Sequence, residues 1–154
     1  MALKQESFAE ELRKYAKASL DSSILIYHLE DLQPYSDLTE AIFSNIAEGS
    51  LHAVISTICV TELLVKPFAK GQADRVTALE QFLFALPNMA VVPPNYSIAK
   101  EAARLRATYA MRTPDALLVA TALNERAEVF LTNDSHLASL KAEGLTILIL
   151  DDYI

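Results

Sequence analysis

Residues 112–137 read RTPDALLVATALNERAEVFLTNDSHL, and this stretch predicts the fold class. Its apolar residues first follow a helical period over 114–126 and then form a short continuous run inside the segment EVFLT, residues 128–132. A run of that length, closed by turn residues, is typical of a buried strand. A buried strand with a helix on each side is the repeating unit of a parallel sheet.

The same alternation of short apolar runs and helical segments continues through most of the chain. We therefore expect a single-domain α/β protein whose central, mostly parallel sheet is covered by helices on both faces. An amphipathic helix over 6–17 precedes the first strand, so we expect an N-terminal helical extension over 1–17 and one domain over 18–154. The strands are expected at 18–21, 51–57, 88–92, 128–132 and 145–150.

Composition limits the class of protein further. The chain has 154 residues, 52% of them hydrophobic and 21% charged, which suits one globular domain with a substantial core. Its single cysteine, Cys59, lies in an apolar run and has no partner for an internal disulfide. The N-terminus is too polar for a signal peptide, so we expect a reducing, cytoplasmic setting.

The charge is acidic overall but uneven along the chain. The formal net charge of −7 argues against a protein that coats nucleic acids. Residues 66–112 nevertheless carry seven basic residues against three acidic ones, which gives this segment +4 and the remainder −11. A basic rim beside an acidic site would suit a phosphate-backbone substrate. Solvated helix faces that are basic without a function are an equally good interpretation of the sequence alone.

Four acidic residues lie where strands end or helices begin. Asp21 follows the first strand, Glu62 lies in the helix after the second, Asp115 is in the first turn of a helix, and Asp134 follows the fourth strand. The carboxyl ends of parallel strands share one edge of a sheet, where open α/β folds place their chemistry. Carboxylates gathered there repel one another unless a cation lies between them. The sequence thus predicts a site for Mg²⁺ or Mn²⁺, which prefer oxygen ligands.

Each carboxylate also has a simpler interpretation. Asp21 and Asp134 are plausible N-caps, and Asp115 suits a first turn in which Thr113 is the N-cap and Pro114 the first helical residue. Glu62 has no capping role, because it lies among apolar residues inside its helix. The occurrence of all four at one expected edge favours the metal site.

Several neighbouring polar residues are candidates for binding the substrate or orienting the carboxylates. Ser22 and Asn133 carry groups that could hydrogen-bond a phosphate or a metal-bound water, and Asn133 is preferred over Thr132. Arg112 could contact a substrate phosphate, or form a surface salt bridge with Asp115. The sequence contains no GxGxxG, GxxxxGK[ST] or GxSxG motif, which removes the usual signals for dinucleotide, P-loop and serine-hydrolase sites.

The motifs LDSSILIYHL, ISTICVTELL, RLRATYAMRTPDALLVATAL and FLTNDSHL together resemble the PIN-domain ribonucleases, most closely the VapC-type toxins of toxin–antitoxin pairs. The similarity runs from about residue 18 to the C-terminus. The first motif reads Asp-Ser-Ser where the family usually has Asp-Thr-Asn, so Ser23 replaces an amide. This departure leaves the efficiency of catalysis open.

The resemblance implies a five-stranded parallel sheet, dependence on Mg²⁺ or Mn²⁺, and endonucleolytic cleavage of RNA. It also implies homodimerisation and a small antitoxin protein that blocks the site. The family's catalytic and metal-binding roles correspond to Asp21, Glu62, Asp115 and Asp134. In the expected mechanism Asp21 and Asp115 hold the principal ion and the other two complete its ligands or recruit a second ion. Water then attacks the phosphorus in line, leaving a 5′-phosphate and a 3′-hydroxyl.

Two alternatives remain open at this point. One is an enzyme of the same fold that serves RNA processing or DNA metabolism without an antitoxin. The other is a catalytically weak protein that uses the acidic site to bind a metal or a partner. A homodimer is expected through surplus apolar side chains on two helices, which are Tyr35, Leu38, Ile42 and Phe43 on one and Leu79, Phe82 and Leu83 on the other.

Overall fold

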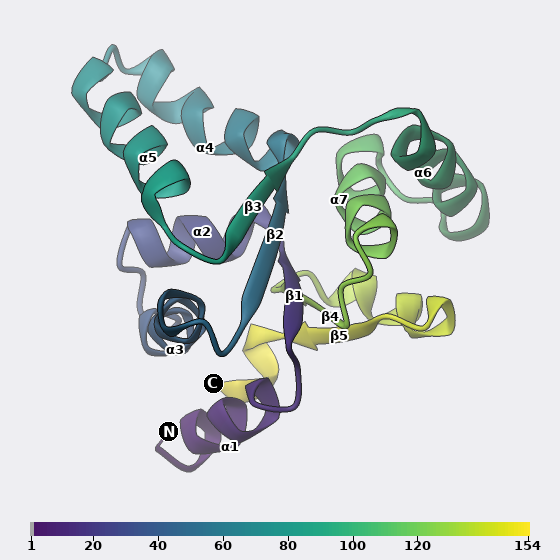
Figure 1. Ribbon diagram of the computed structural model, residues 1–154, viewed down its shortest axis with the longest axis horizontal. Coiled ribbons are helices and arrows are strands. Elements are labelled where there is room, and N and C mark those ends of the chain that lie inside the picture. The colour runs from purple at the N-terminus through teal and green to yellow at the C-terminus, as the bar shows by residue number, and fades with distance from the viewer. Residues whose placement is uncertain (1) are drawn as a thin grey trace.

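A parallel sheet of five strands forms the centre of the molecule (Figure 1). The computed structural model describes residues 2–154. Strand order is β3-β2-β1-β4-β5, and every pair of neighbours is parallel, so the expected fold class is confirmed. The strands are β1 (Lys17–Leu20), β2 (His52–Ser56), β3 (Met89–Val92), β4 (Val129–Thr132) and β5 (Thr146–Ile149).

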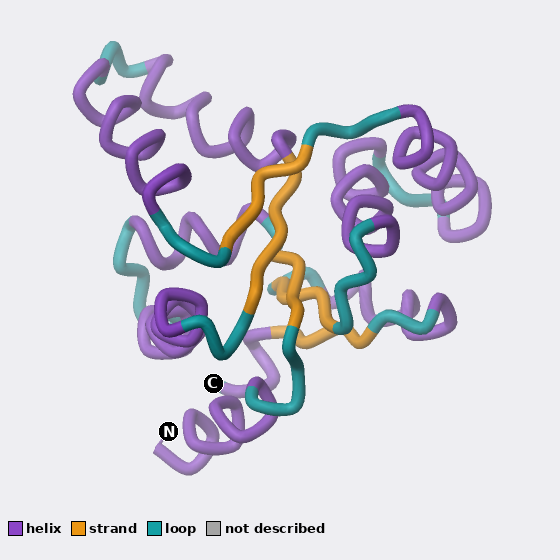
Figure 2. Tube along the Cα trace, viewed as in Figure 1, coloured by secondary structure: helices purple, strands orange, loops and turns teal. Residues whose placement is uncertain are grey.

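Helices flank the sheet on both sides. In Figure 1, α2, α3 and the α4–α5 hairpin lie on one side of the strands, and α6 and α7 on the other. Figure 2 shows the strands running through the centre and the extended connection of residues 93–95 that leads from β3 to α6. The α-helices are α1 (Ala2–Leu12), α2 (Ser22–Leu29), α3 (Ser36–Glu48), α4 (Thr57–Ala69), α5 (Ala73–Ala85), α6 (Tyr96–Tyr109) and α7 (Thr113–Asn124).

The central strands are buried on both faces. All four residues of β4 are buried, as are the last three of β1 and the last four of β2. A strand covered by helices on both faces needs a continuous apolar run rather than an alternating pattern. Polar residues therefore cluster immediately after the strands, which places them at the carboxyl edge of the sheet.

The C-terminal third departs from the expected elements in detail. The segment expected as an α-helix after Asp134 is the 3-10 helix η1 (Ser135–Glu143), and a second 3-10 helix, η2 (Leu150–Tyr153), follows β5. The N-cap of α7 is Arg112 rather than Thr113. Arg112 takes the extended conformation that is typical of an N-cap, and Thr113 is therefore the first residue of the helix.

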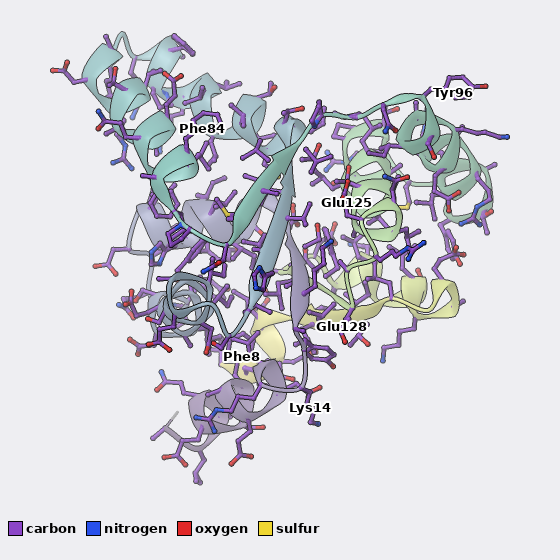
Figure 3. The ribbon with its side chains drawn as sticks, in the orientation of Figure 1. Phe8, Lys14, Phe84, Tyr96, Glu125 and Glu128 are labelled. Atoms are coloured by element: carbon purple, nitrogen blue, oxygen red, sulfur yellow. The ribbon has the colours of Figure 1, made fainter. Side chains whose placement is uncertain are left out.

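The N-terminal helix begins and ends earlier than the 6–17 range predicted from the sequence. Helix α1 contacts α3 and η2, and its Phe8 and Leu12 are buried in the main core. The ring of Phe8, which is labelled in Figure 3, meets that of Tyr153 edge-on, with 5.0 Å between centroids. Whether 1–17 is separable from the domain over 18–154 remains a proposal, but these contacts give α1 a structural role in the core.

The apolar residues expected at a dimer interface are not available for one. Leu38, Ile42, Phe43, Leu79 and Leu83 are buried in the chain itself, and Tyr35 and Phe82 are half-buried. These particular side chains are covered within the chain, because α3 packs on α1 and α2 while α5 packs on α4. The large hydrophobic residues that are exposed are Leu3, Leu32, Val65, Phe68, Phe84 and Tyr96.

Two of these exposed side chains are labelled in Figure 3, Phe84 on α5 and Tyr96 at the start of α6.

Within residues 2–154, no helix is both long and apolar enough to cross a membrane.

Candidate functional site at the carboxyl edge of the sheet

Strand order brings the four predicted carboxylates to one edge. β1 lies between β2 and β4, so Asp21 after β1 is flanked by the segments that carry Glu62 and Asp134. Asp115 enters from α7, which packs against β1, β2 and α4. Electrostatic interactions connect three of the four, because the charge of Asp115 acts on both Asp21 and Glu62.

Asp21 is held by a neighbouring strand rather than by its own helix. It occupies the N-cap position of α2, yet its side chain makes no capping hydrogen bond. The hydroxyl of Thr132 donates to Asp21 Oδ2 at 2.6 Å, and the Asp21 amide donates to the carbonyl of Leu131 at 2.9 Å. Asp21 is thus the N-cap residue by position, as the simpler interpretation expected, but its side chain does not make the capping hydrogen bond.

The environment of Asp21 disfavours its charge. Burial is the main reason that the pKa of the Asp21 carboxyl is raised, and the nearby charge of Asp115 raises it further. The hydrogen bond from Thr132 acts in the opposite direction but does not cancel these effects. Asp21 is therefore a desolvated carboxylate whose side chain makes no capping hydrogen bond.

Glu62 shares a hydroxyl group with Asp21. Ser22 Oγ donates to Glu62 Oε2 at 3.0 Å and lies 3.4 Å from Asp21 Oδ1. Partial desolvation is the largest cause of the raised pKa of Glu62, followed among the raising causes by the charges of Asp21 and Asp115. Among residues 2–154, neither Asp21 nor Glu62 forms a salt bridge.

Asp115 has a basic partner. Its Oδ2 accepts a hydrogen bond from Arg112 Nε at 3.1 Å, while the Arg112 side chain is 80% exposed. Asp115 also lies in the first turn of α7, where the helix dipole favours an anion. The salt-bridge interpretation of Arg112 therefore describes the structure, and a phosphate would have to compete with Asp115 for it.

Asp134 is a helix cap. Its Oδ1 accepts one hydrogen bond from the backbone amide of His136 at 3.0 Å, and it also lies 3.0 Å from His136 Nδ1. The Asp134 amide donates in turn to Thr132 Oγ1 at 3.0 Å. Thr132 thus connects Asp21 with Asp134, and the capping role predicted for Asp134 is present.

The structure assigns a different task to Asn133 than the sequence suggested. Asn133 donates to the hydroxyl of Tyr27 at 3.1 Å and accepts from the Asp151 amide at 2.8 Å, so its side chain joins α2 to η2. Thr132, ranked lower from sequence, makes the contact with Asp21. The register of β1 and β4 explains this contact. Leu20 pairs with Leu131, so the next residues, Asp21 and Thr132, are neighbours.

Ser23 occupies the position at which the first motif departs from its family pattern. Its hydroxyl is buried and has no hydrogen-bond partner, and it is the one buried side-chain oxygen or nitrogen in residues 2–154 of which this is true. Buried hydroxyls are usually hydrogen-bonded, so the Ser23 hydroxyl in the first turn of α2 is an exception.

The oxygen-rich donor set suits Mg²⁺ or Mn²⁺, and burial together with the neighbouring carboxylates raises the pKa values of Asp21 and Glu62. In the part of the chain that the structure describes, however, no three acidic, histidine or cysteine side chains are gathered tightly enough to hold an ion. The Ser22 hydroxyl lies between the carboxylates of Asp21 and Glu62, and Arg112 forms a salt bridge with Asp115. The donors therefore fit such an ion chemically but are not arranged as a finished coordination shell.

Two cavities flank the carboxylates. One of about 350 Å³ includes Glu62 in its wall, and one of about 480 Å³ includes Asp115 and Asp134. The first lies between α2 and the α4–α5 hairpin, and the second lies beside η1. An extended substrate that crosses the carboxyl edge would find space on either side.

Comparisons with known proteins agree with this architecture. The sequence model of the PIN domain matches residues 18–143. No match to a curated protein sequence was found.

Solved structures resemble the chain over nearly its whole length. A toxin–antitoxin complex from Klebsiella pneumoniae contains a chain with 25% identity and a TM-score of 0.61, covering 84% of this chain and 95% of that one. DNA-bound VapBC from Salmonella typhimurium gives 20% identity and a TM-score of 0.64, with 88% and 98% covered. VapBC-1 from nontypeable Haemophilus influenzae gives 19% identity and a TM-score of 0.65, with the same coverage.

The family match spans most of the chain, and the strand order, the helical layers and the acidic carboxyl edge agree with it. The family resemblance noted in the sequence motifs is confirmed, and the chain belongs to the PIN domain family.

Proposed function

We propose that this protein is a metal-dependent endoribonuclease that hydrolyses RNA phosphodiester bonds, and that it is the toxin of a toxin–antitoxin pair. The observation that carries the proposal is Asp21. It stands at the carboxyl end of the central strand, is desolvated, makes no cap and has no salt bridge among the described residues. Such a carboxylate costs stability unless something binds it.

In the proposed site, each of the four carboxylates has a role in binding the cation. Asp21 and Asp115 would hold the principal ion, and Glu62 and Asp134 would complete its ligands directly or through water, or hold a second ion. A bound Mg²⁺ or Mn²⁺ would neutralise charge on the phosphate and lower the pKa of a water molecule. Thr132 keeps Asp21 oriented, and Ser22 keeps Asp21 and Glu62 adjacent. Water attack in line would then leave a 5′-phosphate and a 3′-hydroxyl.

The reaction is tested with purified protein and a mixture of RNA molecules. Cleavage should occur with Mg²⁺ or Mn²⁺ and stop in excess chelator, and the Asp21→Asn protein, prepared in parallel, should be inactive. Product ends are read by phosphatase-dependent labelling. Cleavage that continues in excess chelator, or that survives in Asp21→Asn, would show that the carboxylates do not perform the reaction.

Membership of a toxin–antitoxin pair is supported by the similar solved structures, which are toxin–antitoxin complexes. The partner would be a small protein that covers the acidic edge. Induced expression of the chain alone should arrest growth, Asp21→Asn should not, and co-expression of the protein encoded by the adjacent gene should restore growth. Normal growth with an active, well-expressed nuclease would favour a housekeeping role in RNA processing or DNA metabolism.

A homodimer remains part of the proposal, but through a different surface from the one the sequence suggested. Val65 and Phe68 are exposed on α4 and Phe84 on α5, at 60%, 66% and 70%. A second copy packed on this hairpin would remove these side chains from water. Sedimentation should show a dimer at micromolar concentration, and Phe68→Lys should shift it to monomer. A monomeric parent protein would contradict the dimer without affecting the proposed reaction.

A further inference from the structure

A groove leads away from the acidic edge between α2 and the α4–α5 hairpin. It is the cavity of about 350 Å³ that has Glu62 in its wall. Its floor is apolar and includes Leu63, Pro67 and Leu79, all of which are buried. Its lining also carries three cations, Lys66, Lys70 and Arg75, and a second acidic residue, Glu30. We call this the α4 groove.

The cations of the α4 groove are exposed and weakly engaged. Lys66 Nζ lies 3.5 Å from Glu30 Oε1, a solvent-exposed pair of the kind that contributes little. Lys70 and Arg75 form no salt bridge with any residue that the structure describes. Arg75 Nη2 donates only to the Leu29 carbonyl, at 3.3 Å. These groups are free to meet an anion.

The groove is aligned with the acidic edge by helical periodicity. Glu62, Lys66 and Lys70 are spaced four residues apart along α4 and its C-cap, so they follow one side of the helix. Each step advances roughly 6 Å along the axis. The row therefore begins at a carboxylate of the candidate metal site and continues outward as cations.

We propose that the α4 groove binds the phosphates of single-stranded RNA on one side of the bond to be cleaved. This inference rests on the proposed function and adds the path of the substrate. The basic cluster lies in a chain of net charge −7, so an RNA strand would be attracted to this cluster and repelled by most other surfaces. Glu62 belongs to both sites, which makes the groove continuous with the place of reaction.

The lining also determines what kind of contact is made. No aromatic side chain lines the groove among the residues that the structure describes, so bases have no ring to stack on. Lys and Arg would bind the sugar–phosphate backbone, which positions a strand but does not read its sequence. The α4 groove would therefore contribute affinity without selecting the cleavage site.

Binding is measured with the full chain, in chelator so that RNA is not cleaved, using fluorescence anisotropy of a short fluorescein-labelled single-stranded RNA. The test variant is Lys66→Gln/Lys70→Gln/Arg75→Gln. The control variant is Arg13→Gln/Lys100→Gln/Lys141→Gln, which removes the same charges from exposed positions that form no salt bridge among the described residues. Both are compared over a series of salt concentrations.

The test variant should bind about tenfold more weakly or worse, and its plot of log affinity against log salt should lose roughly 2 in slope, because each phosphate contact on a single strand contributes about 0.7. The control should stay close to the parent protein. Lys66→Gln/Lys70→Gln, which leaves the Arg75 contact with Leu29 intact, should show roughly two thirds of the change in slope.

Equal losses in test and control variants would overturn the inference, because they would mean that only net charge matters. Unchanged RNA affinity together with lost binding of a protein partner would overturn it as well, and would make the groove a protein-docking site. Failure of the proposed function looks different. In that case the parent protein would not cleave RNA with Mg²⁺ or Mn²⁺, whatever the groove variants bind.

Discussion

The two halves of the acidic edge are built differently. In the half formed by β1 and α4, Asp21 and Glu62 share only the hydroxyl of Ser22 and have raised pKa values. In the half formed by α7 and η1, Asp115 pairs with Arg112 and Asp134 caps a helix.

The difference shows which carboxylates are informative. Helix caps and salt bridges account for Asp115 and Asp134 in a protein with no catalytic function, since both contributions are ordinary sources of stability. They do not account for Asp21, whose carboxylate is desolvated, or for Glu62, which is exposed and has neither a cap nor a salt bridge among the described residues. Asp21 and Glu62 are therefore the stronger candidates for binding a cation. Asp115 and Asp134 would bind it only after Asp115 releases Arg112 and Asp134 releases the His136 amide.

The largest effect is expected from Asp21→Asn. The amide keeps the shape and can still accept from Thr132, but it removes the charge at the centre of the site. We expect cleavage to fall about a thousandfold, which corresponds to losing several kcal/mol of metal-assisted stabilisation. In chelator the melting temperature should stay the same or rise, because repulsion is relieved.

Asp115→Asn is the matched control for this comparison. Its cleavage should also be lost, but its melting temperature in chelator should rise less than that of Asp21→Asn. The reason is that Asp115→Asn loses the salt bridge with Arg112 and a favourable charge–dipole interaction of about 0.3–1 kcal/mol. Equal stability changes in the two variants, measured by calorimetry, would remove the distinction between the two halves.

The next largest effect is expected from Thr132→Val, which tests the link between the halves. Valine keeps the volume but removes the donor to Asp21 and the acceptor for the Asp134 amide. Metal affinity and cleavage should fall about 10–100-fold, as for other groups that orient ligands. Calorimetric titration with Mn²⁺ measures this directly.

Thr132→Ser should restore most of the metal affinity, because it returns the hydroxyl. The valine variant should also lose about 1–3 kcal/mol of stability from polar groups left unpaired in a buried position. Full Mn²⁺ affinity in Thr132→Val would mean that Asp21 is positioned by its backbone alone.

A smaller effect is expected from Arg112→Gln. Without the guanidinium, Asp115 is free to turn toward a cation, so half-maximal cleavage should require less Mg²⁺, by a factor below ten. Stability should change little because the Arg112 side chain is exposed. If KM for RNA rises while the Mg²⁺ requirement is unchanged, Arg112 contacts the substrate rather than shielding Asp115.

The smallest effect is expected from pH in metal-free buffer. Raised pKa values mean that the folded protein binds protons at Asp21 and Glu62 more tightly than the unfolded chain does. Their contribution to stability is therefore lost at neutral pH. It returns as the pH falls through the raised values and is complete below the ordinary pKa values of 3.8 and 4.5.

The measurement compares the parent protein with Asp21→Asn/Glu62→Gln between neutral pH and about pH 5. The free energy of unfolding of the parent should approach that of the double variant as the solution is acidified. A gap that widens on acidification would show that these carboxylates are stabilised, not strained, in the folded chain.

The sequence by itself determined the parts of this protein that depend on local patterns. Short apolar runs and helical periods predicted the parallel sheet, because burial on both faces imposes a recognisable composition on each strand. The same local logic placed Asp21 and Asp134 directly after strands and Asp115 in a first turn. The family motifs and their order were readable without any long-range contact.

Only the tertiary structure decided which of these residues meet and what each side chain does. The pairing of β1 with β4 puts Thr132 rather than Asn133 beside Asp21, and the packing of α3 and α5 hides apolar residues that had been expected at an interface. Strand register and helix packing join residues far apart in the chain, as Asp21 and Thr132 are. Periodicity within a segment carries no information about such pairs, because it records which face is buried but not what covers it.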